Sequence, residues 1–174
     1  MMMSRVTMLL GKMKGGAPNP SVVRPRAALV GAAGGFAAIG LLALLTQWSA
    51  ASWIMAPFGA SCVLAFGLWD SPLAQPRNII GGHLLSTLVG LLVYHLIGGG
   101  ALSLALGVGL AIGLMMVTRT THPPAGADPI VVILAGSGWS FLLTPVLAGS
   151  VAIVAAALLL NNVDPNRRYP VFWK

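Results

Sequence analysis

Residues 121–128 read THPPAGAD, and they lie in the middle of a chain that is otherwise mostly apolar. Backbone groups freed by proline inside a bilayer must find partners within the protein. Ionisable side chains at membrane depth are rare and mark functional sites by default. Because His122 and Asp128 both belong to this octapeptide, it is the first place to look for a helix break and a functional site.

The composition excludes a soluble globular domain. Hydrophobic residues make up 57% of the 174 residues and charged residues only 7%, whereas soluble domains carry about 25% charged residues. So few charges cannot cover a soluble surface, and the chain must therefore face lipid. The single cysteine, Cys62, cannot form an intrachain disulfide. No metal-ligand spacing is present, so we expect neither a metal nor a cofactor.

Basic residues gather at the two ends of the chain, where five precede the first apolar run and three follow the last. This placement is typical of a topology signal, not of a nucleic-acid surface. We expect a flexible basic cytoplasmic tail at 1–26, a membrane domain at 27–161 and a basic cytoplasmic tail at 162–174. The expected location is the bacterial inner membrane, and the glycine-rich helix faces are compatible with a homodimer.

The membrane domain contains six apolar segments, at about 27–47, 53–69, 79–97, 101–117, 123–135 and 141–160. Four approach the roughly 20 residues that a spanning helix needs, and the second and fifth are shorter and contain prolines. Either four segments cross and the short ones re-enter, or all six cross. Six crossings place Arg77 and Arg119 on the cytoplasmic side with both termini, which the positive-inside rule favours.

The two short segments begin alike. Residues 57–61 read PFGAS and residues 124–128 read PAGAD, at an offset of 67 residues, and the same offset separates Gly82 from Gly149. The chain therefore predicts an all-α fold made of two three-segment repeats, inverted because each repeat crosses an odd number of times. Inverted repeats with broken helices at matching positions are typical of transporters. Duplication for symmetry alone is the alternative.

Each break places a proline at the first turn of a half helix, where its missing N–H is tolerated. A helix N-terminus carries partial positive charge and binds anions. Two facing N-termini would form a site for one small anion. The predicted substrate-binding residues are Gly59, Ala60, Ser61, Thr120, Thr121, His122, Gly126 and Ala127, and the residues predicted to shape the breaks are Pro57, Pro123, Pro124 and Asp128.

The ionisable residues near the breaks have two interpretations each. His122 either donates to the anion and carries a proton, or caps broken backbone. Asp128 would repel an anion, so we expect it to pair with Arg119 or His122, or to cap the half helix. Arg77, His83 and Arg119, together with His122, are candidates for a gate or proton relay.

Several separated motifs also match a known family. They are PFGAS at 57–61, DSPLAQPRN at 70–78, GGH at 81–83, the HPP run at 122–124, and RRYP at 167–170. The chain resembles the HPP family of integral membrane proteins from about residue 26 onward. That resemblance implies anion transport, with nitrite as the substrate associated with cyanobacterial and plastid members. It also implies four spans, where the charge pattern favours six.

The function predicted is therefore transmembrane transport of a small inorganic anion, nitrite first. The alternatives are a passive channel for a small polar solute and a non-transporting membrane scaffold. A negative interior opposes anion entry, so uptake calls for protons as a second substrate. An enzyme is not expected, because the only acidic residues are Asp70, Asp128 and Asp164, and they form no obvious pair.

Overall fold

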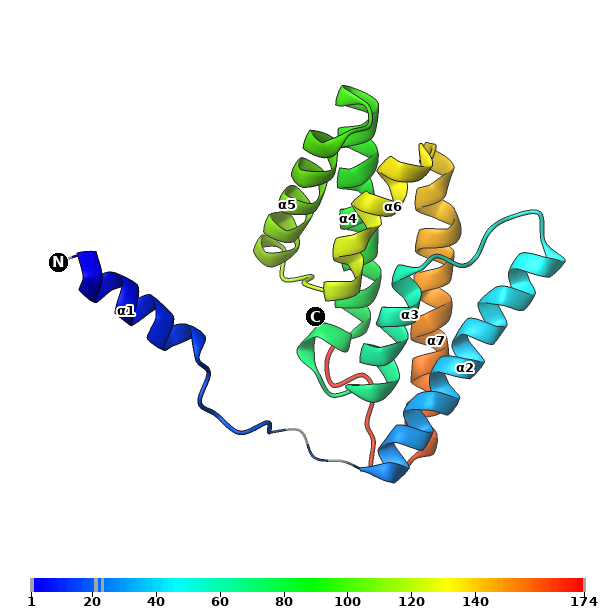
Figure 1. Ribbon diagram of the computed structural model, residues 1–174. Coiled ribbons are helices and arrows are strands. Elements are labelled where there is room, and N and C mark those ends of the chain that lie inside the picture. Colours follow the sequence, from blue (N-terminus) through cyan, green and yellow to red (C-terminus); the bar gives the residue numbers. More distant parts are fainter. Residues whose placement is uncertain (1, 21, 23, 174) are drawn as a thin grey trace.

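The computed structural model describes residues 2–20, 22 and 24–173, and this part of the chain contains helices and no β-strand (Figure 1). The predicted all-α class is confirmed. The α-helices are α1 (Met2–Met13), α2 (Pro25–Trp48), α3 (Pro57–Cys62), α4 (Pro76–Ile97), α5 (Ala101–Val117), α6 (Asp128–Ala135) and α7 (Ala148–Val163). Short 3-10 or π turns are η1 (Val63–Gly67), η2 (Pro72–Ala74), η3 (Pro123–Ala127), η4 (Trp139–Leu142) and η5 (Leu143–Leu147).

Each of the six apolar segments is helical. Three helical stretches, 25–48, 76–97 and 139–163, are long and apolar enough to cross a membrane. The second and fifth segments form the short stretches 57–67 and 123–135, and the fourth forms the 17-residue α5. Pro57 begins the first short stretch as predicted, but the second begins at Pro123, one residue before the expected Pro124.

Both short helices begin inside the bundle beside α4 (Figure 1), where His122 lies against Gly82 and Phe58 meets His83. Residues 49–56 lead back from the end of α2 to α3 without forming a helix, and residues 120–122 link α5 to η3 in the same way. Non-helical backbone at that depth must be covered by protein. Helix α4 covers the second link, where Gly82 lies against Thr120 O. Helix α7 approaches the first link at Trp53 O, and residues 49–56 are otherwise mostly exposed.

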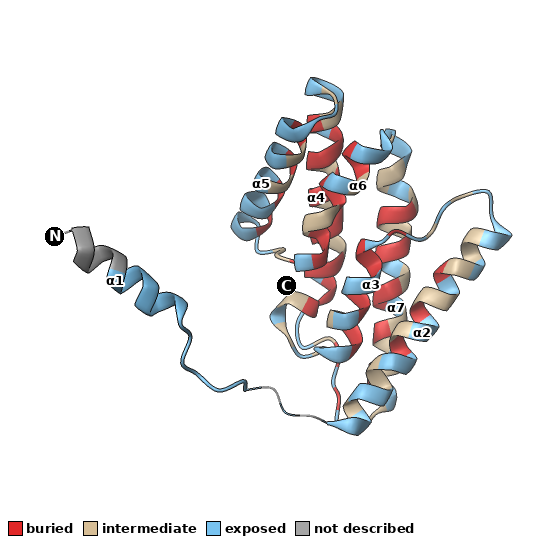
Figure 2. Cartoon of the chain, viewed as in Figure 1, coloured by how far each residue is buried: buried red, intermediate tan, exposed pale blue. Residues whose placement is uncertain are grey.

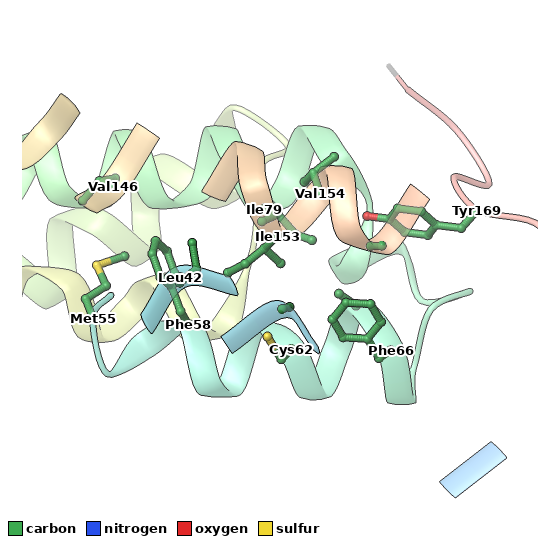
Figure 3. Packing of buried hydrophobic residues seen from close by; sticks show 13 residues of the cluster. Leu42, Met55, Phe58, Cys62, Phe66, Ile79, Val146, Ile153, Val154 and Tyr169 are labelled. Carbon is green, nitrogen blue, oxygen red and sulfur yellow. The ribbon is translucent and has the colours of Figure 1, made fainter. Parts of the chain in front are cut away.

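The main hydrophobic cluster lies between α2, α3, α4 and α7 (Figure 3). Phe58 and Phe66 are fully buried in it, against Ile79 and Ile153. Figure 2 shows that exposed residues dominate α2 and α5, whereas buried ones follow α4. Their exposed apolar side chains include Phe36 on α2 and Leu102 on α5. Lipid tails are as apolar as leucine, so this surface suits a bilayer.

Two glycines make matching close contacts with backbone. A Cβ on Gly82 would lie 2.8 Å from the Thr120 carbonyl oxygen, and one on Gly149 would lie 2.9 Å from the Trp53 carbonyl oxygen. Gly82 and Gly149 are 67 residues apart, and so are Trp53 and Thr120. Only glycine therefore lets α4 and α7 approach the two non-helical links this closely.

The terminal segments differ from each other. Within the tail predicted at 1–26, Met2–Met13 form helix α1, which Figure 1 shows away from the bundle; residues 1, 21 and 23 lie outside the described residues. The C-terminal segment packs back onto the bundle. Arg167 Nη1 donates to Phe66 O at 2.8 Å and to Asn161 Oδ1 at 2.9 Å, and the Tyr169 hydroxyl donates to Ala74 O at 2.8 Å.

Candidate functional site

Four fully buried side chains from four parts of the chain meet where the short helices begin. The Ser61 Oγ lies 2.7 Å from His83 Nε2 and 2.9 Å from His122 Nε2. His83 Nδ1 lies 2.8 Å from Asp128 Oδ2. At the other end, His122 Nδ1 donates to the Leu73 carbonyl oxygen at 2.8 Å. We call Asp128, His83, Ser61 and His122 the buried polar chain.

The helix breaks place these groups. Ser61 lies one turn after Pro57 in α3, and Asp128 begins α6 directly after η3. His83 is on α4, beside Gly82, and His122 immediately precedes η3. A Cβ on Gly82 would lie 2.7 Å from the His122 Cβ, so the missing side chain makes room for the imidazole. The two imidazole rings stand 5.0 Å apart, edge to face.

Helix α4 supplies the hydrogen bonds that the second break requires. Pro129 has no N–H to offer Ala125 O, and this oxygen accepts instead from the Asp128 N–H and from the Ser86 hydroxyl at 2.6 Å. Asn78 Nδ2 donates to Thr121 O at 2.8 Å in the same manner. The broken backbone is thereby satisfied inside the protein, as membrane depth demands.

Asp128 is the least satisfied member of the buried polar chain. Its Oδ2 also accepts from the Thr87 hydroxyl at 3.2 Å. Its Oδ1 is the one buried side-chain oxygen or nitrogen, among the described residues, that has no hydrogen-bond partner. The expected partners Arg119 and His122 were wrong, because Asp128 pairs with His83. The alternative place in the first turn of the half helix is confirmed, since Asp128 is the first residue of α6, although its side chain makes no cap hydrogen bond. Helix α4 packs beside the start of α6, which places the His83 imidazole next to the Asp128 carboxyl.

The other predicted binding residues differ in how deeply they are buried. Thr120 packs against Gly81, and Gly126 and Ala127 are half-buried in η3. Gly59 and Ala60 are exposed, and Gly59 lines a groove of about 1000 Å³ between α2 and α3. The structure therefore brings Ser61 and His122 together and leaves Gly59 on an outer face.

The N–H groups expected to be open at the helix starts have partners. Phe58 N donates to Met55 O at 3.0 Å, and Gly59 N donates to Ala56 O at 3.2 Å. At the second break, Ala125 N donates to His122 O at 3.0 Å. The polar side chains that meet between the breaks are thus those of the buried polar chain.

The two arginines predicted as gate residues lie away from this chain. Arg77 Nη2 donates to Thr118 O at 3.0 Å in an exposed position. Arg119 is also exposed, with a left-handed φ of 58°. Within the described part of the protein, no three His, Cys, Asp or Glu side chains group as metal ligands.

Asp128, His83 and Ser61 are connected like the triad of serine hydrolases, carboxylate to imidazole to hydroxyl. A nucleophile must reach its substrate, however, and the Ser61 side chain is fully buried. Its hydroxyl also meets a second imidazole, that of His122, which the triad lacks. The geometry therefore suits holding and passing a proton better than acyl transfer.

Sequence reasoning named all four members of the chain but did not join them. The signal for two of its members was available, because Ser61 and Asp128 occupy the same position in the two 67-residue-spaced motifs. The link through His83 had no such signal. It depends on how far α4 is rotated and on the depth at which the short helices begin.

Helices with an apolar outer surface, arranged around a buried chain of ionisable groups, define an all-helical transmembrane protein with a polar centre. The chain belongs to the HPP family, because the family model described as "HPP, transmembrane region" matches residues 20–170.

Two transmembrane proteins of Dictyostelium discoideum are similar to it. One is 39% identical over 128 residues, covering 69% of this chain and 41% of the relative. The other is 37% identical over 128 residues, covering 69% of this chain and 45% of the relative. The chain thus spans less than half the length of these relatives. No solved structure matches it.

Proposed function

We propose that this protein transports a small inorganic anion, nitrite first, through the region between its two helix breaks. The observation that carries the proposal is the contact of the Ser61 hydroxyl with both His83 and His122 deep inside the helices. Buried ionisable groups in membrane segments mark substrate or ion pathways. The resemblance to nitrite-transporting members of the HPP family supplies the substrate.

The proposed architecture is six crossings in two inverted repeats. The support is the matched pair of contacts, Gly82 with Thr120 and Gly149 with Trp53, whose members are related by the same 67-residue offset. In inverted-repeat transporters the substrate site lies near the midplane, at discontinuous helices. The buried polar chain lies beside the starts of α3 and η3, and we propose this as the equivalent position.

The proposed binding groups are the Ser61 hydroxyl and a protonated His122 Nε2. Both point at one another in this structure, so an anion enters by replacing their mutual hydrogen bond. A negative interior opposes anion entry by about 2.3 kcal/mol per charge for every 100 mV. One proton moving with nitrite removes that opposition, and the buried imidazoles are the groups that accept it.

The other roles follow from position. Thr120, Thr121, Gly126 and Ala127 line the proposed path on the η3 side, and the exposed Arg77 and Arg119 attract anions toward it. We place the protein in a bacterial inner membrane with both termini cytoplasmic, because Arg77 and Arg119 then lie on the positive side. We also propose a homodimer, because the glycine-rich helix faces allow close helix contacts.

The test is nitrite uptake into proteoliposomes. We expect saturable uptake with the wild type and at least a tenfold loss in Ser61→Ala and His122→Ala. Matched controls are Ser150→Ala and His95→Ala. Ser150 Oγ donates to Leu147 O, just before α7, and His95 is an exposed histidine stacked on Trp139. Uptake no faster than in empty liposomes would exclude nitrite as the substrate. Uptake that does not saturate with nitrite concentration would favour a channel.

A further inference from the structure

The buried polar chain contains four hydrogen bonds in series, and each needs one hydrogen. The links join Leu73 O to His122 Nδ1, His122 Nε2 to Ser61 Oγ, Ser61 Oγ to His83 Nε2, and His83 Nδ1 to Asp128 Oδ2. The donor–acceptor distances, from 2.7 to 2.9 Å, are all ordinary hydrogen-bond distances. Since a carbonyl only accepts, His122 carries a hydrogen on Nδ1.

The ordinary charge states supply one hydrogen too few. An ionised Asp128 with two neutral imidazoles gives one N–H each, plus the Ser61 hydroxyl hydrogen. Ser61 can then donate to only one imidazole, and its oxygen faces a bare ring nitrogen on the other. Its weaker acceptor, Pro57 O at 3.3 Å, does not change this count. A buried polar pair without its hydrogen costs about 1–3 kcal/mol.

We propose that the buried polar chain holds one exchangeable proton, so that it carries four hydrogens and no net charge. The proton sits on the Asp128 carboxyl, on His83 or on His122. Asp128 Oδ1 has no partner, which leaves a bare carboxylate poorly stabilised and adds to the cost of losing the proton. Among the described residues, the only salt bridge that involves a member of the buried polar chain is the one between His83 and Asp128.

Ser61 relays this proton between the imidazoles. When His83 is the imidazolium, its Nε2–H donates to Ser61 Oγ, and the Ser61 hydroxyl donates to His122. Transfer breaks the His83 N–H and the Ser61 O–H, and forms a new Ser61 O–H and a new His122 N–H. Positive charge moves from the α6 end toward Leu73 in η2, with no hydrogen gained or lost.

The inference deepens the proposed function. Its role in transport rests on that function, whereas the hydrogen count does not depend on any transported solute. The groups facing the chain are Thr87 from α4, bonded to Asp128, and the ring of Phe58 from α3, which meets His83 edge-on at 5.1 Å. Neither titrates near neutrality. The buried polar chain therefore stores a single proton, and movement of this proton is coupled to the entry of an anion between the breaks.

The deciding measurement is ¹⁵N NMR of histidine-labelled protein in lipid vesicles without nitrite, which reports the hydrogen on each ring nitrogen. Four hydrogens predict that His83 is protonated on Nε2 alone beside a neutral Asp128 carboxyl, whose ¹³C shift is read in the same sample, or that either His83 or His122 is protonated on both nitrogens. Hydrogen on Nε2 alone beside an ionised Asp128 gives three and overturns the proposal. Hydrogen on Nδ1 alone in both His83 and His122 gives three and overturns the proposal. A His122 lacking hydrogen on Nδ1 also overturns it.

Asp128→Asn gives an independent check. Its amide N–H donates to His83 Nδ1 as a neutral acid does, so the variant keeps the hydrogen bonds but loses the exchangeable proton. We expect His83 to be protonated on Nε2 alone at every pH, whereas Asp164→Asn, at an acid outside the buried polar chain, leaves the wild-type spectrum unchanged. A His83 that still titrates in Asp128→Asn overturns the proposal.

The two proposals fail separately. If the spectra give four hydrogens but proteoliposomes take up no nitrite, the proton site stands and the substrate is wrong. If nitrite uptake is saturable but both imidazoles carry hydrogen on Nδ1 alone, transport stands and the proton store is wrong.

Discussion

Asp128 Oδ2 lies 2.8 Å from His83 Nδ1, although 45 residues separate the two and both side chains are fully buried. This contact ties α6 to α4 across the second helix break. An isolated ionised group in such surroundings is strongly destabilising unless it is paired. The pair is therefore a stability determinant as well as part of the candidate site.

Removing His83 should cost more stability than neutralising its partner. His83→Ala leaves a buried carboxyl without its imidazole, and breaking a buried pair in this way costs about 3–5 kcal/mol. Asp128→Asn keeps a hydrogen bond and should cost less. Unfolding in mixed micelles measures both, and the double variant should recover part of the loss. Equal destabilisation by the two single variants would contradict this.

Adding a methyl group at Gly82 or Gly149 should destabilise the bundle. The new Cβ would lie 2.8 Å or 2.9 Å from a backbone carbonyl oxygen, which cannot move aside easily. Overpacking of this kind costs about 1–3 kcal/mol. Gly109→Ala and Gly113→Ala are matched controls, because nothing lies within 4 Å of either new Cβ. The controls should gain up to about 1 kcal/mol in helix propensity.

The end of α7 should show acid-dependent stability. A hydrogen bond from the Asn166 backbone N–H, and after it the charge of Arg26, hold the pKa of Asp164 below its usual value. Because the folded-state pKa is lowered, this stabilisation is present above the unfolded pKa of about 3.9. It is lost as the pH falls through the folded-state pKa.

The variant for this prediction is Asp164→Asn. Its melting temperature should lie below that of the wild type near neutral pH, and the gap should close in acid. A gap that stays constant from neutral pH to below about pH 4 would show that the Asp164 charge has no part in it.

The C-terminal segment should stabilise the bundle through Arg167. Arg167→Ala removes the donor to Phe66 O and Asn161 Oδ1, and an unsatisfied buried acceptor costs about 1–3 kcal/mol. Arg168→Ala, at the exposed neighbour, is the control and should change the unfolding free energy little. If the two variants have the same unfolding free energy, the C-terminal contact contributes no stability.

Ser61 should not behave as a hydrolase nucleophile. A fluorophosphonate probe labels activated serines that a substrate can reach, and the Ser61 hydroxyl is enclosed by two imidazoles. We expect no labelling of the folded protein in lipid, with a soluble serine hydrolase as the positive control. Labelling that requires both Ser61 and His83 would instead establish an enzyme.

Hydropathy predicted the helices because lipid exposure leaves little choice of side chain along a spanning segment. The six apolar runs correspond to helical stretches, and the proline at the start of α3 was correct. The second break was predicted one residue late, because Pro123 and Pro124 are both allowed in the first turn of a helix.

The contacts inside the candidate site were less accessible to prediction. The pairing of His83 with Asp128 follows from helix rotation and depth, which hydropathy does not encode. Likewise, Arg167 was predicted only as part of a basic topology signal, and it is also buried against Phe66 O. A charged residue can serve both purposes, and only packing tells them apart.

The hydrogen bonds from Ser86 and Asn78 onto the second break fasten η3 to α4. The first break has a different anchor, since Trp53 N donates to Thr46 Oγ1 on α2. The two non-helical links are therefore held by different helices, so loosening α4 would free the second link and leave the Thr46 contact of the first in place.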